Sequence, residues 1–327
     1  MRAWVFADHG EPDAVLRLVD DCAVPRPRAD QILVAVESAA VNFADALIIG
    51  GTYQSSPPLP AVAGMELSGT VVAAGPDSPV VRGDRVAGLG AHMSGAFGEY
   101  AVLDAGSYFV PPADYSAVEA ACFTVAYQTA WFAVHVRGGT RSGDVVLVHA
   151  AAGGVGLAAV QIAAAAGARV IGVVGSPDKV PAATAAGCSD VLVRDGGDLV
   201  AAVKAAAGGS VDVVVDPVGG RSHTVSERVV GFAGRIVIVG FASGEIPPVR
   251  ADLLMVKNYS VVGLHWGLYR DRRPDIVSGE YANLSACVTD STIRPLVGEE
   301  FPFTEVPAAL RAVTTGRNVG RVAVRVR

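Results

Sequence analysis

The feature that most constrains this chain is a glycine-rich turn set between a strand and a helix. An apolar run, Val145–His149, leads into AAAGGVG at 150–156, and an alanine-rich stretch follows. Small residues let the chain turn tightly and bring backbone N–H groups close to a pyrophosphate, which the dipole of the following helix also attracts. Ala151 stands where the usual pattern has its first glycine, so the pattern is A-x-G-x-x-G. The segment predicts a dinucleotide site contacted by Gly153, Gly154, Val155 and Gly156.

Alternating strand and helix patterns surround this turn. Six short runs rich in β-branched residues are nearly continuous in hydrophobicity, as expected when helices cover both faces of a parallel sheet. The spacing predicts right-handed βαβ units in a doubly wound parallel sheet, an α/β fold, over residues 121–265. The alternative is a flavodoxin-like domain whose glycine-rich turn binds no dinucleotide. The predicted strands are Val145–His149, Arg169–Val174, 191–193, Val211–Asp216, 235–240 and Ser260–Gly263.

The end of the second strand indicates which dinucleotide is bound. An NAD site has Asp or Glu there, about 20 residues past the glycines, to accept a hydrogen bond from the ribose 2′-hydroxyl. This chain has VVGS at 173–176, then Lys179, and Arg194 just after the third strand. A 2′-phosphate carries close to two negative charges, so Ser176, Lys179 and Arg194 predict NADPH (NADP) as the cofactor. In the alternative, both cations are solvated and Asp178 serves an NAD ribose.

Further candidates follow the later strands, because ligands of such sheets bind outside the carboxyl ends of the strands. Gly240 and Phe241 end the fifth strand and are candidate cofactor contacts. His265 and Trp266 follow the sixth strand, where they either line a substrate cleft or join the domains. His149 ends a buried strand, and we interpret it as a structural histidine.

The regions that flank the predicted sheet have a different pattern. Glycine, proline and short alternating runs over the first 120 residues predict turns and antiparallel strands. A helix-like stretch at 306–314 and a strand at 321–326 close the chain. The alternation of RVAVRVR at the end predicts an edge strand rather than a basic arm.

Composition and charge exclude several classes of partner. Hydrophobic residues make up 51% of the 327 residues and charged residues 18%, and the formal net charge is -6. Such a chain gives no electrostatic footprint for nucleic acid or an anionic membrane. Residues 150–168 carry no charge, but they are mostly alanine and glycine, a weak driving force for membrane insertion. Four widely spaced cysteines and no signal-peptide pattern predict a cytoplasmic protein.

Several segments together identify the chain as similar to a known family. They are VNFAD (41–45), GGTY (50–53), GMELSGTVVAAG (64–75), GDRV (83–86), TAW (129–131), HAAAGGVGLAAVQIA (149–163), VDVVVDPVGG (211–220) and KNYSVVG (257–263). The chain resembles, over essentially its whole length, the zinc-independent quinone oxidoreductases of the medium-chain dehydrogenase/reductase superfamily, the group that includes ζ-crystallin.

The resemblance implies an architecture. A Rossmann domain at 121–265 is expected to be inserted in a mainly-β, GroES-like catalytic domain made of 1–120 and 266–327. A homodimer, joined at the sixth Rossmann strand, is also implied. Zinc-dependent relatives carry a ligand His in a GHE motif where this chain has Met65, and their four-cysteine lobe is missing here. No metal is therefore expected.

The resemblance also implies roles for three residues. Asn42 and Tyr53 are expected to face the nicotinamide end of the cleft, where each could donate a hydrogen bond to developing oxyanion character. Thr129 is expected to contact the cofactor. Alternatively, Asn42 serves turn chemistry and Tyr53 packs on the neighbouring prolines. Some family members carry a tyrosine where this chain has Leu47, which weakens the analogy for Tyr53.

Three functions remain open at this point. The first is NADPH-dependent reduction of a quinone or similar activated carbonyl, and the second is reduction of the C=C bond of an enone or enoyl thioester. A CoA thioester would need a basic entrance, for which Arg270, Arg272 and Arg273 are candidates, although a solvated loop is the simpler interpretation. The third is a non-enzymatic NADPH-binding protein.

Overall fold

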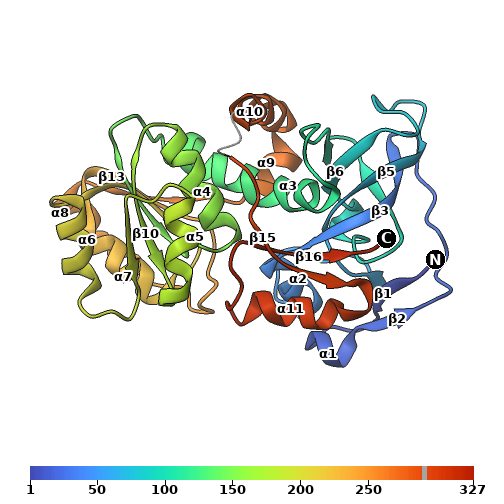
Figure 1. Cartoon of the computed structure of the whole chain (residues 1–327), viewed down its shortest axis with the longest axis horizontal. Coiled ribbons are helices and arrows are strands. Elements are labelled where there is room, and N and C mark those ends of the chain that lie inside the picture. Colours follow the sequence, from blue (N-terminus) through green and yellow to red (C-terminus); the bar gives the residue numbers. More distant parts are fainter. Residues whose placement is uncertain (289–292) are drawn as a thin grey trace. The chain divides into compact units, whose positions relative to one another are not determined.

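The computed structural model describes residues 1–288 and 293–327, which form two compact units (Figure 1). One unit is Met1–Val125 with Pro295–Arg327, and the other is Ala126–Arg294. The C-terminal boundary therefore differs from the predicted one, because 266–294 belongs to the second unit rather than to the catalytic domain. Side-chain contacts hold this segment there: the Phe132 and Tyr269 rings meet edge to face, and Trp131 Nε1 donates to Glu280 at 2.7 Å.

The second unit is built on the predicted parallel sheet. Its strand order is β11-β10-β9-β12-β13-β14, the doubly wound order with its switch point between β9 and β12. Val146, Leu147 and Val148 in the central strand are fully buried, as expected for a strand covered on both faces. The α/β fold class is confirmed. The strands are β9 (Val145–His149), β10 (Arg169–Val174), β11 (Asp190–Val193), β12 (Val211–Asp216), β13 (Val230–Ile238) and β14 (Ser260–Gly263).

Helices connect these strands and cover the sheet. Figure 1 shows α6 and α7 lying side by side, and α8 follows next to β13. The helices are α4 (Gly154–Ala165), α5 (Val180–Ala185), α6 (Leu199–Ala207), α7 (Gly220–Val229), α8 (Ala251–Lys257), α9 (Trp266–Arg272) and α10 (Pro274–Cys287), with a 3₁₀ turn, η3 (Pro177–Lys179). The helix α3 (Ala117–Trp131) ends in a π-helical turn, η2 (Phe132–Arg137).

The first unit is mainly β. A large sheet has the order β15-β16-β3-β5-β6-β8, with β7 also paired to β3, and a small sheet has the order β2-β1-β4. Its strands are β1 (Ala3–Phe6), β2 (Arg17–Val19), β3 (Gln31–Val41), β4 (Ala61–Val62), β5 (Glu66–Ala74), β6 (Arg85–Leu89), β7 (Tyr100–Asp104), β8 (Tyr108–Phe109), β15 (Val297–Pro302) and β16 (Arg321–Arg325). Its helices are α1 (Pro12–Val15), α2 (Phe43–Ile49) and α11 (Val306–Thr314), with short turns η1 (Ala91–Met93) and η5 (Phe303–Glu305).

The last strand folds back onto the N-terminal part of the chain, as predicted. β16 pairs antiparallel with β3, Val322 lying opposite Val41. The prediction of an edge strand was wrong, because β15 pairs with the other side of β16 and places it inside the sheet. The charged residue that suggested an edge, Arg321, is instead buried. Within the described residues, no helix combines the length and apolarity needed to cross a membrane.

Candidate functional site

The glycine-rich turn has the geometry that close approach to a ligand requires. The chain leaves β9 through Ala150, whose φ is +50°, and Gly153 precedes the first turn of α4. An added Cβ on Gly156 would lie 2.1 Å from the carbonyl oxygen of Ala150. Only glycine therefore lets α4 pack against the turn, which leaves the helix N-terminus and its N–H groups at the end of β9.

Ala151 replaces the first glycine of the usual motif, and strand β10 has a glycine that makes room for it. Ala151 donates its N–H to the carbonyl of Val173 at 3.0 Å, which fastens the turn to β10. An added Cβ on Gly172 would lie 2.9 Å from the Ala151 methyl and 2.6 Å from Cys188 Sγ. Gly172 thus provides the space that the Ala151 side chain occupies. The sequence contains this compensation, but only the pairing of β9 with β10 reveals it.

Two cations lie together beyond the ends of β10 and β11. The Arg194 N–H donates to the Val174 carbonyl at 2.9 Å, which joins the ends of these strands. Burial, together with the positive charge of Arg194, lowers the pKa of Lys179, although Asp178 opposes the shift. The buried Nε of Arg194 has no hydrogen-bond partner within residues 1–288 and 293–327. A guanidinium left in this state, next to a like charge, is the chemistry of an anion site.

The carboxylate of Asp178 is engaged elsewhere. A hydrogen bond from Ser176 is the main cause that lowers the pKa of Asp178, and the side chain is exposed. Ser176 precedes the 3₁₀ turn η3, and Lys179 ends that turn. In the alternative in which Asp178 serves an NAD ribose, the carboxylate would share its acceptor sites between Ser176 and the ribose.

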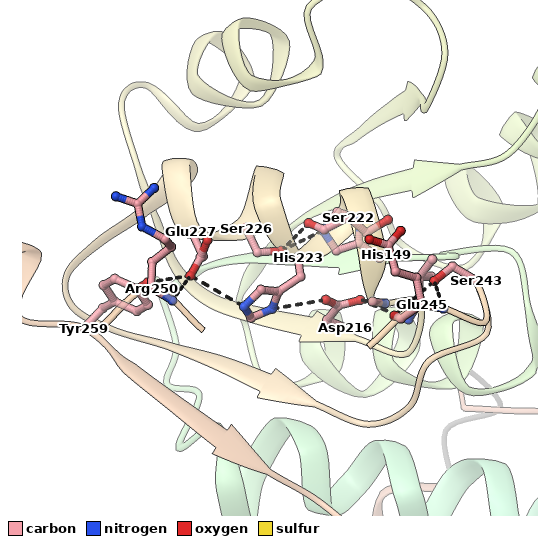
Figure 2. Close-up of polar contacts among 12 residues, drawn as sticks. His149, Asp216, Ser222, His223, Ser226, Glu227, Ser243, Glu245, Arg250 and Tyr259 are labelled. Atoms are coloured by element: carbon pink, nitrogen blue, oxygen red, sulfur yellow. Dashed lines mark hydrogen bonds and ion pairs between the residues drawn. The ribbon is translucent and has the colours of Figure 1, made fainter. Parts of the chain in front are cut away.

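The turn after β12 is shaped by a buried carboxylate, which Figure 2 shows among its neighbours. Asp216 Oδ1 accepts hydrogen bonds from the N–H groups of Val218 and Gly219, both at 2.9 Å. The nearby His223 ring and these two amides hold the pKa of Asp216 below its usual range, even though burial favours the neutral acid. The His223 ring lies between Asp216 and Glu227, its nitrogens 3.7 Å from each carboxylate.

His149 lies in the same buried cluster and its hydrogen bonds define its tautomer. Ser226 Oγ donates its one proton to the Ser222 carbonyl at 2.8 Å, so it accepts from His149 Nε2 at 2.9 Å. Nδ1 is then the unprotonated nitrogen, and it is buried without a donor among the described residues. Burial lowers the pKa of His149 to about 4, and the positive charge of Arg194 acts in the same direction although Asp216 opposes it. His149 is therefore neutral near pH 7.

The predicted Asn42 lies in the first unit, inside a buried polar cluster. Its Nδ2 donates to Glu66 Oε2 at 3.0 Å, and its Oδ1 accepts from Arg321 at 3.1 Å. Arg321 also binds Glu66 Oε2 directly at 2.6 Å, and both side chains are buried. Because a guanidinium only donates, it fixes the orientation of the Asn42 amide and leaves one amide N–H for another acceptor.

Asp45 fastens the start of α2 within this cluster. Its carboxylate accepts from the Asn42 N–H at 2.7 Å and from the Met65 N–H at 3.0 Å. Burial raises the pKa of Asp45 to about 7, and the two amide bonds oppose that shift. The helix that carries Asn42 is thereby tied to the residue that precedes β5. Tyr53 follows the end of α2, where its N–H donates to the Leu47 carbonyl at 3.2 Å, and its side chain is partly buried.

The remaining predicted residues follow the sheet of the second unit. Phe241 packs near Gly219, where an added Cβ would lie 2.8 Å from the ring, and Gly240 precedes it. His265 is exposed and precedes α9, while Trp266 is buried. Thr129 lies on α3 with 9% of its surface exposed. All the candidates in this unit other than Thr129 thus lie along one edge of the sheet, beyond the carboxyl ends of its strands, while Asn42 and Tyr53 belong to the first unit.

The comparisons with known proteins cover both units. Residues 28–113 match the family described as alcohol dehydrogenase GroES-like domain, and residues 154–279 match the family described as zinc-binding dehydrogenase. Quinone oxidoreductase-like protein 2 of Bos taurus is 38% identical over 93% of this chain and 88% of its own length. The structure of the quinone oxidoreductase from Thermus thermophilus has 33% identity, a TM-score of 0.85 and full coverage of both chains. The Escherichia coli quinone oxidoreductase, solved with NADPH, has 28% identity and a TM-score of 0.90 over 99% of this chain and 100% of that one.

The chain belongs to the zinc-independent quinone oxidoreductase family of the medium-chain dehydrogenases and reductases. The quinone oxidoreductase relatives match nearly the whole chain, so the similarity includes both domains. Among the residues that the structure describes, no group of three or more His, Cys, Asp or Glu side chains could hold a metal ion. In this quinone oxidoreductase family member, Met65 stands directly before Glu66, at the position where zinc-dependent relatives carry a ligand histidine. The Glu66 carboxylate forms an ion pair with Arg321.

Sequence reasoning missed two of the residues that shape these sites. Arg321 was assigned to an edge strand, and Glu66 was only one letter of a family motif. Their positions are 255 apart in the chain, so the pair depends on the fold-back of β16. The sequence did contain one signal for Arg321. It stands at the start of a strand whose next three residues are all apolar, as expected for a buried strand.

Proposed function

We propose that the chain is an NADPH-dependent oxidoreductase that reduces a quinone or a similarly activated carbonyl without a metal ion. The observation that carries the cofactor assignment is the cation pair at the ends of β10 and β11: Arg194 with a buried, unpartnered Nε, beside Lys179. A 2′-phosphate monoester would supply the acceptors that this guanidinium lacks. The complexes of the Escherichia coli and Thermus thermophilus enzymes with NADPH support the same cofactor.

Different residues of the second unit would bind different parts of the dinucleotide. The backbone of Gly153, Gly154, Val155 and Gly156 would bind the pyrophosphate at the start of α4, where the glycine at 156 is sterically required. Ser176, Lys179 and Arg194 would bind the 2′-phosphate, and Gly240 and Phe241 would line the cofactor beyond β13. Thr129 would contact the nicotinamide end. When bound, NADPH supplies the hydride.

Asn42 and Tyr53 are proposed to orient and polarise the acceptor. The free N–H of the Asn42 amide has a fixed direction, because Glu66 and Arg321 hold the other atoms of the group. A donor that is already oriented stabilises developing negative charge without further reorganisation. Tyr53 would add a phenolic donor. His265 and Trp266 are proposed to line the substrate cleft.

The enoyl-thioester alternative has less support from the structure. Arg270 pairs with Asp271 at 2.8 Å, and Arg273 pairs with Asp275 at 2.8 Å. Two of the three arginines that could form a basic entrance for CoA are therefore neutralised by neighbours. We retain C=C reduction as the second candidate, and a protein that binds NADPH without turnover as the third.

The deciding experiment records NADPH oxidation at about 340 nm, the nicotinamide absorbance used to follow reduced cofactors. Purified protein is assayed with 1,4-benzoquinone, 9,10-phenanthrenequinone and a crotonyl thioester, with NADH in parallel. Quinone-dependent turnover that prefers NADPH is expected. Turnover with the thioester alone would move the chain to the C=C reductases, and tight NADPH binding without turnover would support the third candidate.

We further propose a homodimer joined at β14. This strand is the last in the sheet and, within residues 1–288 and 293–327, pairs with β13 alone. Large apolar side chains are exposed on the neighbouring segments, among them Phe232 (80%), Ile246 (74%), Met255 (74%) and Val256 (71%). An open strand edge beside such a surface favours pairing with a second copy. Light scattering is expected to give a dimer at micromolar concentration, and Phe232→Asp should shift it toward monomer. A monomeric parent protein would contradict the proposal.

A cytoplasmic location remains our proposal and has support from the thiols. All four cysteines are free, and burial raises the pKa of the Cys122 and Cys188 thiols to about 12. Thiols of this kind are inert structural groups, which suits a reducing compartment.

A further inference from the structure

A groove between α6 and α7 contains a cavity of about 260 Å³. The two helices pack side by side on the sheet of the second unit (Figure 1). The cavity is lined by the loop after β11, by the first residues of α6 and by one face of α7. Its polar lining comes from Arg194, Asp198, Arg221, Ser222, Thr224 and Arg228.

The charge of this groove is strongly positive. Three of its lining residues are arginines, and none of them forms an ion pair with any residue in 1–288 or 293–327. The carboxylate of Asp198 is used at the start of α6, where it accepts from the Ala201 N–H at 3.1 Å. A concave surface with several cations and a committed carboxylate favours an anionic ligand.

Four backbone N–H groups at and just before the start of α7 are already bonded, so the arginine side chains carry most of the recognition. The N–H groups of Val218 and Gly219 donate to Asp216, and the Gly220 N–H donates to the Glu245 carbonyl at 3.2 Å. The Ser222 N–H donates to the Gly219 carbonyl at 3.0 Å. An anion here would therefore be held mainly by side chains.

Position along α7 distinguishes two of the arginines. Arg194 directly follows β11, and the first turn of α7 follows β12, so both lie at the carboxyl edge of the parallel sheet. Arg221 is in that first turn. Arg228 is seven residues further along, about 10 Å away at 1.5 Å per residue, toward the opposite edge of the sheet. Arg221 therefore shares the edge with Arg194 and Lys179, and Arg228 does not.

We propose that Arg221 is a further specificity-determining residue, which completes with Arg194 and Lys179 the site for the 2′-phosphate of the cofactor. The inference rests on the proposed NADPH dependence and extends it to a helix that carries none of the glycine motif. In this proposal, Lys179, Arg194 and Arg221 surround a phosphate monoester, which carries close to two negative charges at neutral pH. They come from three different elements. NADH lacks this group, so Arg221 acts on the choice between the two cofactors.

The test compares Arg221→Ala with Arg228→Ala, a matched arginine on the same helix and in the same groove. Calorimetry measures the binding of adenosine 2′,5′-bisphosphate and 5′-AMP, which differ only in the 2′-phosphate, and of NADPH and NADH. Arg221→Ala is expected to weaken the bisphosphate and NADPH about tenfold, the usual order for losing one charge-assisted contact. Binding of 5′-AMP and NADH should be unchanged. Arg228→Ala should change none of the four, and Arg221→Lys should keep most of the affinity. Thermal unfolding confirms that each variant is folded.

Arg194→Ala separates failure of this inference from failure of the function on which it rests. If Arg194→Ala weakens the bisphosphate but Arg221→Ala does not, Arg221 has no role and the NADPH assignment stands. Equal losses in the Arg221 and Arg228 variants would also overturn the inference, because they would indicate only a general effect of charge. If neither substitution weakens binding of the bisphosphate more than binding of 5′-AMP, the 2′-phosphate site itself is wrong.

Discussion

Arginine is used in opposite ways in the two units. In the first, Arg321 is buried against Glu66 and Asn42, and Asp45 closes the cluster through backbone amides. In the second, Arg194 lies beside Lys179 with no carboxylate partner among the described residues, and its buried Nε is unsatisfied. The first arrangement has an internal carboxylate for its arginine, although the Arg321 Nε is also buried without a hydrogen-bond partner among the described residues. The second lacks only an anion.

The difference shows how an arginine that stabilises the fold can be told from an arginine that binds a ligand. A buried ion pair offsets its desolvation cost with internal partners, so its loss should appear in folding stability. A guanidinium without an internal carboxylate gains its partner on binding, so its loss should appear in ligand affinity. Variants of the two arginines can therefore test the comparison directly.

The largest effect is expected for the buried pair. Arg321→Met leaves the Glu66 carboxylate without its cation and should lower the free energy of unfolding by about 3–5 kcal/mol. Urea denaturation measures the loss. The double variant Glu66→Gln with Arg321→Met should recover much of it, because no lone charge then remains buried. Arg325→Met is the control: Arg325 lies on the same strand, in an exposed pair with Glu300, and its loss should leave stability nearly unchanged. Equal losses from Arg321 and Arg325 would break the comparison.

The next effect concerns Arg194. Arg194→Ala should cost about 1.5–3 kcal/mol of charge-assisted bonding to the 2′-phosphate, a ten- to a hundredfold loss of NADPH affinity. NADH affinity and the free energy of unfolding should change little, since the side chain has no internal partner to lose. Titration with each cofactor and urea denaturation make the two measurements. Equal effects on NADPH and NADH would refute the assignment.

The smallest of the three effects comes from His149, a buried group that stays neutral although the Asp216 carboxylate lies near it. Its pKa falls to about 4 in the folded protein, against an ordinary value of 6.5. Between these values the unfolded chain binds more protons, so stability contributed by His149 is present at pH 7 and is lost on acidification. The loss should be about 2 kcal/mol by pH 5.

His149→Gln removes this titration and keeps a donor for Ser226. The stability difference between parent and variant should therefore shrink by that amount between pH 7 and pH 5, as measured by urea denaturation at both values. The raised pKa of Asp45 acts in the opposite direction, but it is present in both proteins and cancels. A difference that does not depend on pH would show that His149 is not held neutral by its surroundings.

Much of the second unit could be predicted from sequence, because its signals are local. The glycine turn, the strands and the cations at their ends lie within short stretches whose order the fold preserves. The first unit was harder to predict, because Arg321 meets Glu66 only through long-range pairing of β16 with β3. Arg221 was missed for another reason: nothing in its local sequence shows that α7 packs beside α6. The boundary near 265 was also misplaced, since the contacts that hold α9 and α10 are side-chain contacts to α3 and its π-helical turn.

The interior position of β16 has a consequence for the order of synthesis. The six parallel strands lie between Val145 and Gly263 and can pair as soon as that contiguous stretch has left the ribosome. The large sheet of the first unit cannot close until residues 321–325 emerge, although most of its strands are made first. The part of the β3 edge at 38–41 then stays unpaired for nearly three hundred residues of translation, whereas β7 covers the part at 31–35. Chaperone demand during synthesis should fall mainly on the N-terminal strands, and a stalled chain that lacks β16 would present that edge to its neighbours.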